Sequence, residues 1–176
     1  MEQYYRDARI HPIHEGTTGI QGMDLLGRKV VAQNGQAFNL LIAEIEKTIT
    51  MADKFPELRT YAVQLNDSQT KLQEVTRHLV QVFMKQGAEF FLADATLYLE
   101  LFGIVAISWQ WLLQGIAIRK ALQNPSNNSD IAFYQGKFAA LRYFFGYELP
   151  KTLGLAERLL NGDGLTVDMT AELFND

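Results

Sequence analysis

The densest group of chemically active side chains lies near the start of the chain, where Glu15 stands between His14 and Gly16. His11, His14 and Glu15 together offer the nitrogen and oxygen donors that bind zinc. Pro12 lies between the two histidines and favours a loop rather than a helix face, and no further ligand of recognised spacing follows. We therefore expect no metal site. The simplest interpretation of Glu15 is an acidic residue before a helix, where the helix dipole favours negative charge.

Polar residues follow Glu15 directly and predict the start of that helix. Thr18 and Gln21 have the spacing of a capping box, which predicts a helix beginning near Gly19. A helix that begins there also points backbone N–H groups at any bound anion, so capping and ligand contact are compatible. Upstream, Arg6, Asp7 and Arg9 could bind phosphate, but we expect a structural ion pair.

Helices must position these residues, because apolar side chains recur at helical spacing and no segment alternates convincingly with period two. Three stripes are clear, and each predicts one helix face: Ile20, Met23, Leu26 and Val30; Phe38, Leu41, Ile42, Ile45 and Ile49; and Leu65, Leu72, Val75, Leu79, Val82 and Phe83. Asn34-Gly35 predicts a break between the first two stripes, and Pro56 suits the first turn of the third helix.

The second half of the chain continues the pattern. A helix is expected from about Ala88 to Leu122, bending near Gly103, and its middle is apolar on nearly all sides, which predicts the central helix of the molecule. The run 124–129 predicts a loop, with Ser129 or Asp130 capping the next helix. Pro150 is expected to start a last long helix, closed by the run 161–164.

These elements predict an all-α fold, a helical bundle of five or six helices with a short irregular N-terminal arm, in one compact unit. The tail, residues 165–176, has room for one short turn. The aromatic residues between 133 and 145 exceed what one helix face can bury, so we expect a homo-oligomer, most simply a homodimer; they are Phe133, Tyr134, Phe138, Tyr143, Phe144 and Phe145.

Composition narrows the classes of function. With 16 basic and 20 acidic side chains, the chain has no electrostatic footprint for nucleic acid. No cysteine is present, which excludes disulfides and thiol catalysis and fits a cytoplasmic protein. The apolar run 101–118 contains Gln110 and Gln114, so we expect a buried core helix and no membrane span. The polar N-terminus lacks the apolar region of a signal peptide.

A family resemblance rests on residues 5–30. They contain Tyr-Arg-Asp-Ala-Arg-Ile, then Glu-Gly-Thr-Thr-Gly-Ile-Gln, then Leu-Leu-Gly-Arg-Lys. This run resembles the segment of acyl-CoA dehydrogenases that carries the catalytic glutamate, near the end of their flavin-binding core. Residues 31–176 are similar, in helical pattern and position, to the extra C-terminal helical domain of long members such as the 3-methylmercaptopropionyl-CoA dehydrogenases. The resemblance thus implies a core segment at 1–30 and a helical bundle domain at 31–176.

The resemblance also implies roles for individual residues. Glu15 corresponds to the base that removes the α-proton of an acyl-CoA thioester while a hydride leaves Cβ for FAD. Its backbone N–H would help to hold the thioester oxygen, and Gly16 would let the backbone approach the substrate. Thr17, Thr18 and Gln21 resemble positions that contact FAD. Two positions depart from the pattern: Gly19 replaces a common glutamine, and His14 replaces a tyrosine of the acyl pocket, which implies an altered substrate preference.

Two functions follow from these observations. In the first, the chain is the C-terminal part of an FAD-dependent acyl-CoA dehydrogenase, with an acyl-CoA substrate and an electron-transfer flavoprotein as partners. We expect the isolated chain to be inactive and free of FAD, because it has no glycine-rich phosphate loop followed by a strand and a helix. The alternative is a non-catalytic helical module for oligomerisation or partner binding.

Overall fold

A computed structural model gives the structure of the chain and describes residues 2–11, 17–123 and 128–174. These residues contain helices and no strand, which confirms the all-α fold. The elements, in chain order, are α1 (Glu2–Ala8), α2 (Thr18–Asp24), the π-helical η1 (Leu25–Val30), α3 (Ala32–Ala52), the 3₁₀ turn η2 (Pro56–Leu58), α4 (Arg59–Gln86), α5 (Ala88–Leu92), α6 (Ala95–Leu122), α7 (Asn128–Tyr143), the π-helical η3 (Phe144–Glu148), α8 (Lys151–Asn161) and the 3₁₀ turn η4 (Ala171–Phe174).

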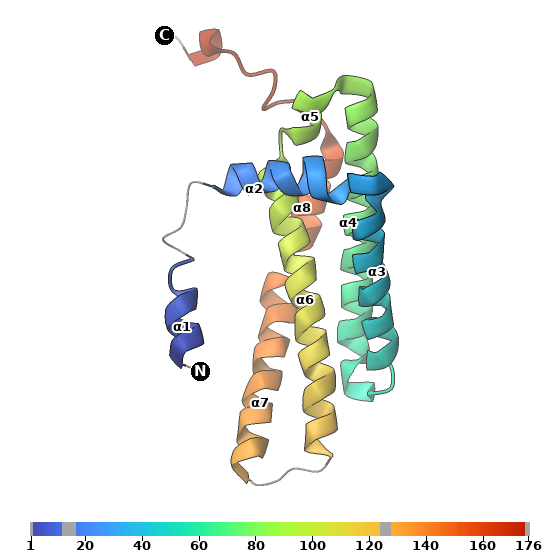
Figure 1. Cartoon of the computed structure of the whole chain (residues 1–176), viewed down its shortest axis with the longest axis vertical. Helices are drawn as coiled ribbons and strands as arrows, with labels where there is room; N and C mark the ends of the chain where they lie inside the picture. Colours follow the sequence, from blue (N-terminus) through green and yellow to red (C-terminus); the bar gives the residue numbers. More distant parts are fainter. Residues whose placement is uncertain (1, 12–16, 124–127, 175–176) are drawn as a thin grey trace.

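The bundle is built around α6, as its apolar composition predicts. Helices α2, α3, α4, α7 and α8 all contact it. In Figure 1, α3 and α4 run beside α6, and α2 lies across one end of the bundle. By length and composition α6 could also cross a membrane, but in this structure it is the helix against which the others pack.

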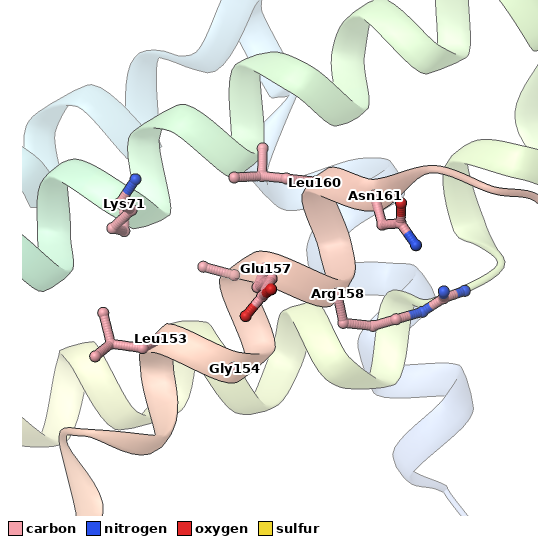
Figure 2. Close-up of a pocket in the computed structure, with 8 residues that line it drawn as sticks. Lys71, Leu153, Gly154, Glu157, Arg158, Leu160 and Asn161 are labelled. Atoms are coloured by element: carbon pink, nitrogen blue, oxygen red, sulfur yellow. The ribbon is translucent and has the colours of Figure 1, made fainter.

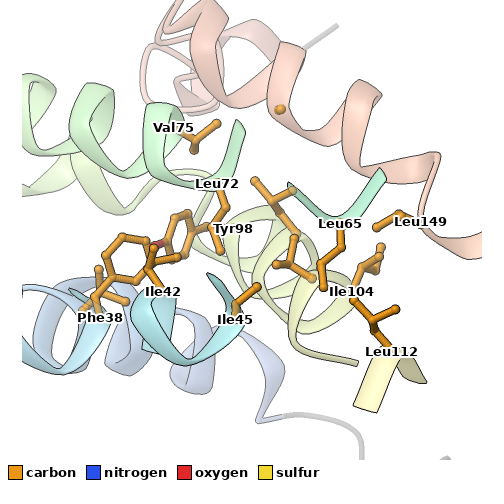
Figure 3. Close-up of a cluster of buried hydrophobic side chains, with 14 of the residues drawn as sticks. Phe38, Ile42, Ile45, Leu65, Leu72, Val75, Tyr98, Ile104, Leu112 and Leu149 are labelled. Atoms are coloured by element: carbon orange, nitrogen blue, oxygen red, sulfur yellow. The ribbon is translucent and has the colours of Figure 1, made fainter. Parts of the chain in front are cut away.

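The core between these helices confirms the two longer apolar stripes except at Phe83, which is 46% exposed. Phe38, Ile42 and Ile45 of α3 meet buried leucines and valines of α4, with Tyr98 of α6 among them (Figure 3). Because these positions repeat every three or four residues, each helix presents one continuous apolar face to the core. Hydrogen bonds join two pairs of polar side chains in the core: Thr76 Oγ1 lies 2.7 Å from the Tyr98 hydroxyl, and Trp109 Nε1 donates to Thr48 Oγ1 at 2.7 Å. Gln69 differs, because its Oε1 atom is buried without a partner among the described residues.

Several helix ends lie where the turn residues predict them. Pro56 opens η2, and Gly87 ends α4 with a φ of 93°. Pro150 immediately precedes α8, and Gly162 ends it in the left-handed conformation. The tail holds the short turn η4. The expected break at Asn34-Gly35 lies near the start of α3. Gln33, Asn34 and Gly35 all have left-handed backbone angles, so the regular right-handed helix of α3 begins after them.

Three helix boundaries differ from the predictions. The expected helix from Ala88 to Leu122 is broken at Ala93–Asp94, not bent near Gly103, which lies inside an unbroken α6. Asp94 leaves the helical conformation and accepts a hydrogen bond from Arg158 Nη2 of α8 at 3.2 Å, a contact that is remote in sequence. Helix α7 already begins at Asn128, so Ser129 and Asp130 lie in its first turn.

The N-terminal arm is less irregular than expected, because it contains the helix α1. Gln3 Nε2 donates to Asp7 Oδ1 at 2.8 Å, and Arg6 lies 4.0 Å from Glu2 across one turn. Such pairs three and four residues apart favour a helix. The ion pair predicted among Arg6, Asp7 and Arg9 is therefore replaced by these contacts. No residue of α1 is buried, and Figure 1 shows it apart from the bundle.

Candidate functional site

The structure describes one side of the site that the sequence predicts. His14, Glu15 and Gly16 lie outside the described residues, which resume at Thr17. Thr17, Thr18 and Gln21 are described and lie together at the start of α2.

The start of α2 is organised by Thr17 and Gln21. The Gln21 backbone N–H donates to the Thr17 carbonyl at 2.9 Å, and Gln21 Nε2 donates to Thr17 Oγ1 at 3.2 Å. The helix begins one residue earlier than the capping-box spacing predicts, so Gln21 pairs with the residue four positions before it. Thr17 is the N-cap residue, but its hydroxyl makes no capping hydrogen bond to the backbone.

The outer face of α2 is uncovered in this chain. Residues 17–21 are all exposed, including Ile20 at 64%, and Met23 on the next turn is 45% exposed. Ile20 and Met23 are thus not on the core face that the spacing predicts. That face is formed by Gly22, Leu26 and Val30.

Gly22 decides which face of α2 is buried. A Cβ at this position would lie 2.6 Å from the carbonyl oxygen of Ala95, so only glycine allows the backbones of α2 and α6 to approach this closely. The close approach turns Leu26 into the core, where it is fully buried, and turns Ile20 outward.

Charges fix the end of α2. Arg28 Nη2 donates to Asp24 Oδ2 at 3.0 Å, and Lys29 Nζ lies 3.3 Å from the same carboxylate. The hydrogen bond from Arg28 is the main cause that holds the pKa of Asp24 below its usual value. Arg28 and Lys29, which belong to the segment that resembles the family, thus bind a carboxylate of this chain and join η1 to α2.

The described residues at the start of α2 leave room for a large ligand. Two hydroxyls and an amide lie on an exposed helix turn, and a Cβ at Gly19 would meet nothing within 4 Å, so a large ligand can approach. Five well-formed cavities at the described residues are lined by other side chains, not by Thr17, Thr18 or Gln21. A flavin at the start of α2 would need further protein to enclose it. Across the described residues no three His, Asp or Glu side chains gather as metal ligands.

A second concave surface lies between α4 and α8. It has a volume of about 800 Å³, and Figure 2 shows Lys71 of α4 facing Leu153 and Glu157 of α8 across it. Its cations are already paired, because Lys71 lies 2.8 Å from Glu74 and Arg158 lies 2.8 Å from Asp163. Neither cation of this surface is therefore available to bind or activate a substrate. Periodicity predicts each helix here, but not that these two faces meet.

His78 of α4 is partly enclosed by the end of α8. It is half-buried, its Nε2 atom is buried without a partner in the described part of the chain, and it lies under Gly162 at the end of α8. The helix face around His78 looks polar in sequence, but α8 and the residues after it cover that face.

Comparison with known proteins identifies relatives over most of the chain. A family model described as "Acetyl-CoA dehydrogenase C-terminal like" matches residues 41–170. A 3-methylmercaptopropionyl-CoA dehydrogenase of Ruegeria pomeroyi is 33% identical over 147 residues, which is 82% of this chain. A broad-specificity linear acyl-CoA dehydrogenase of Mycobacterium tuberculosis and a butyryl-CoA dehydrogenase of Syntrophomonas wolfei are each 26% identical over 97% and 98% of this chain. The chain spans only 24% to 29% of the length of these relatives.

Proposed function

The chain belongs to the acyl-CoA dehydrogenase family as a C-terminal part of such an enzyme, and we propose that the whole enzyme depends on FAD and oxidises an acyl-CoA thioester to a trans-2-enoyl-CoA. The observation that carries the proposal is the family match, which covers residues 41–170 and follows the Glu-Gly-Thr-Thr segment at residues 15–18 in the chain. The exposed start of α2 supports it, because that turn is open to a ligand. Residues 1–30 then complete the catalytic core, and residues 31–176 form the added bundle.

Glu15 is the proposed base. It removes the α-proton of the thioester, a weak acid, so the carboxylate must be made more basic by burial against substrate and protein. Its backbone N–H holds the thioester oxygen, where negative charge develops. Gly16 keeps the backbone accessible to the substrate, and His14 lines the acyl side.

Thr17, Thr18 and Gln21 are the proposed contacts to FAD. When bound, FAD supplies the acceptor for the hydride that leaves Cβ. The three side chains hold the cofactor through hydroxyl and amide hydrogen bonds, and the rest of the enzyme encloses it. An electron-transfer flavoprotein then reoxidises the enzyme. We place the enzyme in the cytoplasm, since the chain contains no cysteine.

Replacing Glu15 by Gln in the full-length enzyme tests the proposal. The amide keeps the shape of the side chain but removes the base, which typically costs a factor of about 10² to 10⁴ in rate. Flavin bleaching after anaerobic mixing with a panel of acyl-CoAs measures the step directly. Flavin content should be unchanged, because Glu15 is proposed to face the substrate.

Glu46→Gln is the matched control, because Glu46 is an exposed glutamate in the middle of α3. This variant should bleach at the wild-type rate. If Glu15→Gln also does so, Glu15 is not the base, and the carboxylate must lie in another part of the enzyme.

A further inference from the structure

A groove that the proposed chemistry does not use lies between the start of α3 and the middle of α4. It has a volume of about 560 Å³, within the range of small-molecule sites. Phe38 and Val30 form its buried floor, and Val31 and Val80 line it with exposed apolar side chains. Apolar side chains left exposed along a concave surface favour a ligand with an apolar part.

Strained backbone forms one wall of the groove. Gln33, Asn34 and Gly35 have φ values of 50°, 56° and 79°, and the last two line the groove. Three consecutive left-handed residues are unusual, because each L residue with a Cβ is disfavoured there. Strain of this kind persists only where the surrounding structure holds it, and it is common at ligand sites.

Arg77 is the one charged side chain among the described residues that line the groove. Its Nε donates to the Gln73 carbonyl at 3.3 Å, which anchors the guanidinium on α4. The neighbouring carboxylate of Glu74 is held by Lys71 at 2.8 Å. Within the described ranges, Arg77 forms no ion pair with a carboxylate. An anion is therefore the natural partner of its terminal amino groups.

From these features we infer that the groove binds a straight-chain carboxylate of medium length, with its head on Arg77 and its chain along Val80, Val31 and Phe38. The groove follows α4 from Gln73 to Gln81, which corresponds to about 12 Å of helix and favours an elongated ligand. The site does not depend on the proposed function. Val30, in its floor, lies roughly 20 Å along α2 and η1 from Thr17, by the helical rise per residue.

Titration of the chain with octanoate tests the inference, with isothermal calorimetry for affinity and amide NMR shifts for location. Octanoate should bind saturably and shift the amides of Val31, Gly35 and Val80. Arg77→Gln should weaken binding about tenfold, because a charge-assisted hydrogen bond is lost. Octanamide, which lacks the charge, and acetate, which lacks the chain, should each bind more weakly than octanoate.

Arg142→Gln is the matched control. Arg142 is an exposed arginine of α7 that lies away from this groove, and its loss should leave octanoate binding unchanged. The inference fails if octanoate does not saturate, if the two arginine variants behave alike, or if octanamide or acetate binds as tightly as octanoate. Circular dichroism identifies a variant that fails to fold. If Arg77→Gln does not fold, Val80→Asp tests the same site, because it places a negative charge in the groove that should repel octanoate. Unchanged octanoate affinity in that variant also overturns the inference. None of these results depends on flavin chemistry at Glu15.

Discussion

Tyr98 shows at the residue scale how this core holds an ionisable group. It is fully buried in α6, and its hydroxyl lies 2.7 Å from Thr76 Oγ1. Burial raises the pKa of the phenol well above its usual value, and the hydrogen bond with Thr76 offsets only part of that effect. Thr76 donates its hydroxyl proton to the Leu72 carbonyl at 2.7 Å, so the hydroxyl pair is anchored on α4.

Tyr98→Phe should therefore have a pH-dependent effect on stability. Near pH 7 the variant loses a buried hydrogen bond, about 0.5–1.5 kcal/mol. Because the folded pKa is raised, the unfolded chain releases this proton first, from about pH 10 upward. The wild type then loses stability with rising pH, by at most about 1.4 kcal/mol per pH unit from this one group, and the variant does not.

Denaturant unfolding of both proteins from pH 7 to pH 11 measures the difference. The advantage of the wild type should shrink above about pH 10. A difference that stays constant over the whole range would show that Tyr98 ionises as easily in the folded chain as in the unfolded one. Lysines and other tyrosines titrate in both proteins, so their effect cancels in the comparison.

At the scale of elements, the turn between η1 and α3 redirects the chain. Helix α2 and η1 lie across the end of the bundle, and α3 runs along it (Figure 1). The left-handed residues 33–35 make this change of direction within a few residues. The same turn forms the wall of the groove beside Arg77, so the direction of α3 and the shape of that groove are coupled.

Replacing glycine by alanine should have opposite effects on stability in this turn and in a regular helix. Gly35→Ala places a Cβ on a residue with a φ of 79° and should destabilise the chain by about 1–2 kcal/mol. Gly103→Ala, inside α6, should stabilise it by about 0.5–1 kcal/mol, because a Cβ there meets nothing within 4 Å. Thermal unfolding of both variants compares them, and shifts in the same direction would argue against the left-handed turn.

At the scale of the whole molecule, two exposed surfaces among the described residues bear on assembly. One is the outer face of α2. The other is the aromatic surface of α7 and η3, where Tyr143 and Tyr147 stack with ring centroids 4.6 Å apart while 56% and 66% exposed. Of the six aromatic residues predicted to exceed one helix face, Phe145 is buried, and Phe133 and Tyr143 are exposed.

We predict that the isolated chain is a homodimer without bound flavin. Exposed aromatic side chains favour association through α7, and the proposed flavin contacts at the start of α2 are too few to hold the cofactor alone. Size-exclusion chromatography with light scattering and visible absorbance, after incubation with FAD, measures both properties at once. A yellow chain with stoichiometric flavin, or a monomer at high concentration, would contradict the corresponding half of the prediction.

Variants locate the dimer surface. Tyr143→Ser combined with Tyr147→Ser should shift the chain toward monomer. Val63→Ser is the control, since Val63 is an exposed apolar residue of α4, outside this aromatic surface. Equal association of the double variant and the wild type would place the contact elsewhere.

The sequence by itself determined most of the helices, two of the three predicted apolar faces and several of the helix ends, because these depend on side chains within a few positions of one another. Gly87, Pro150 and Gly162 mark boundaries through their own backbone preferences. The segment around Glu15 likewise identifies the family without any structure. Only the tertiary structure decided how the faces meet. Gly22 rotates α2 because Ala95 lies against it, and Asp94 breaks a helix with Arg158 as its partner. Such contacts join residues far apart in sequence, and local periodicity carries no information about them.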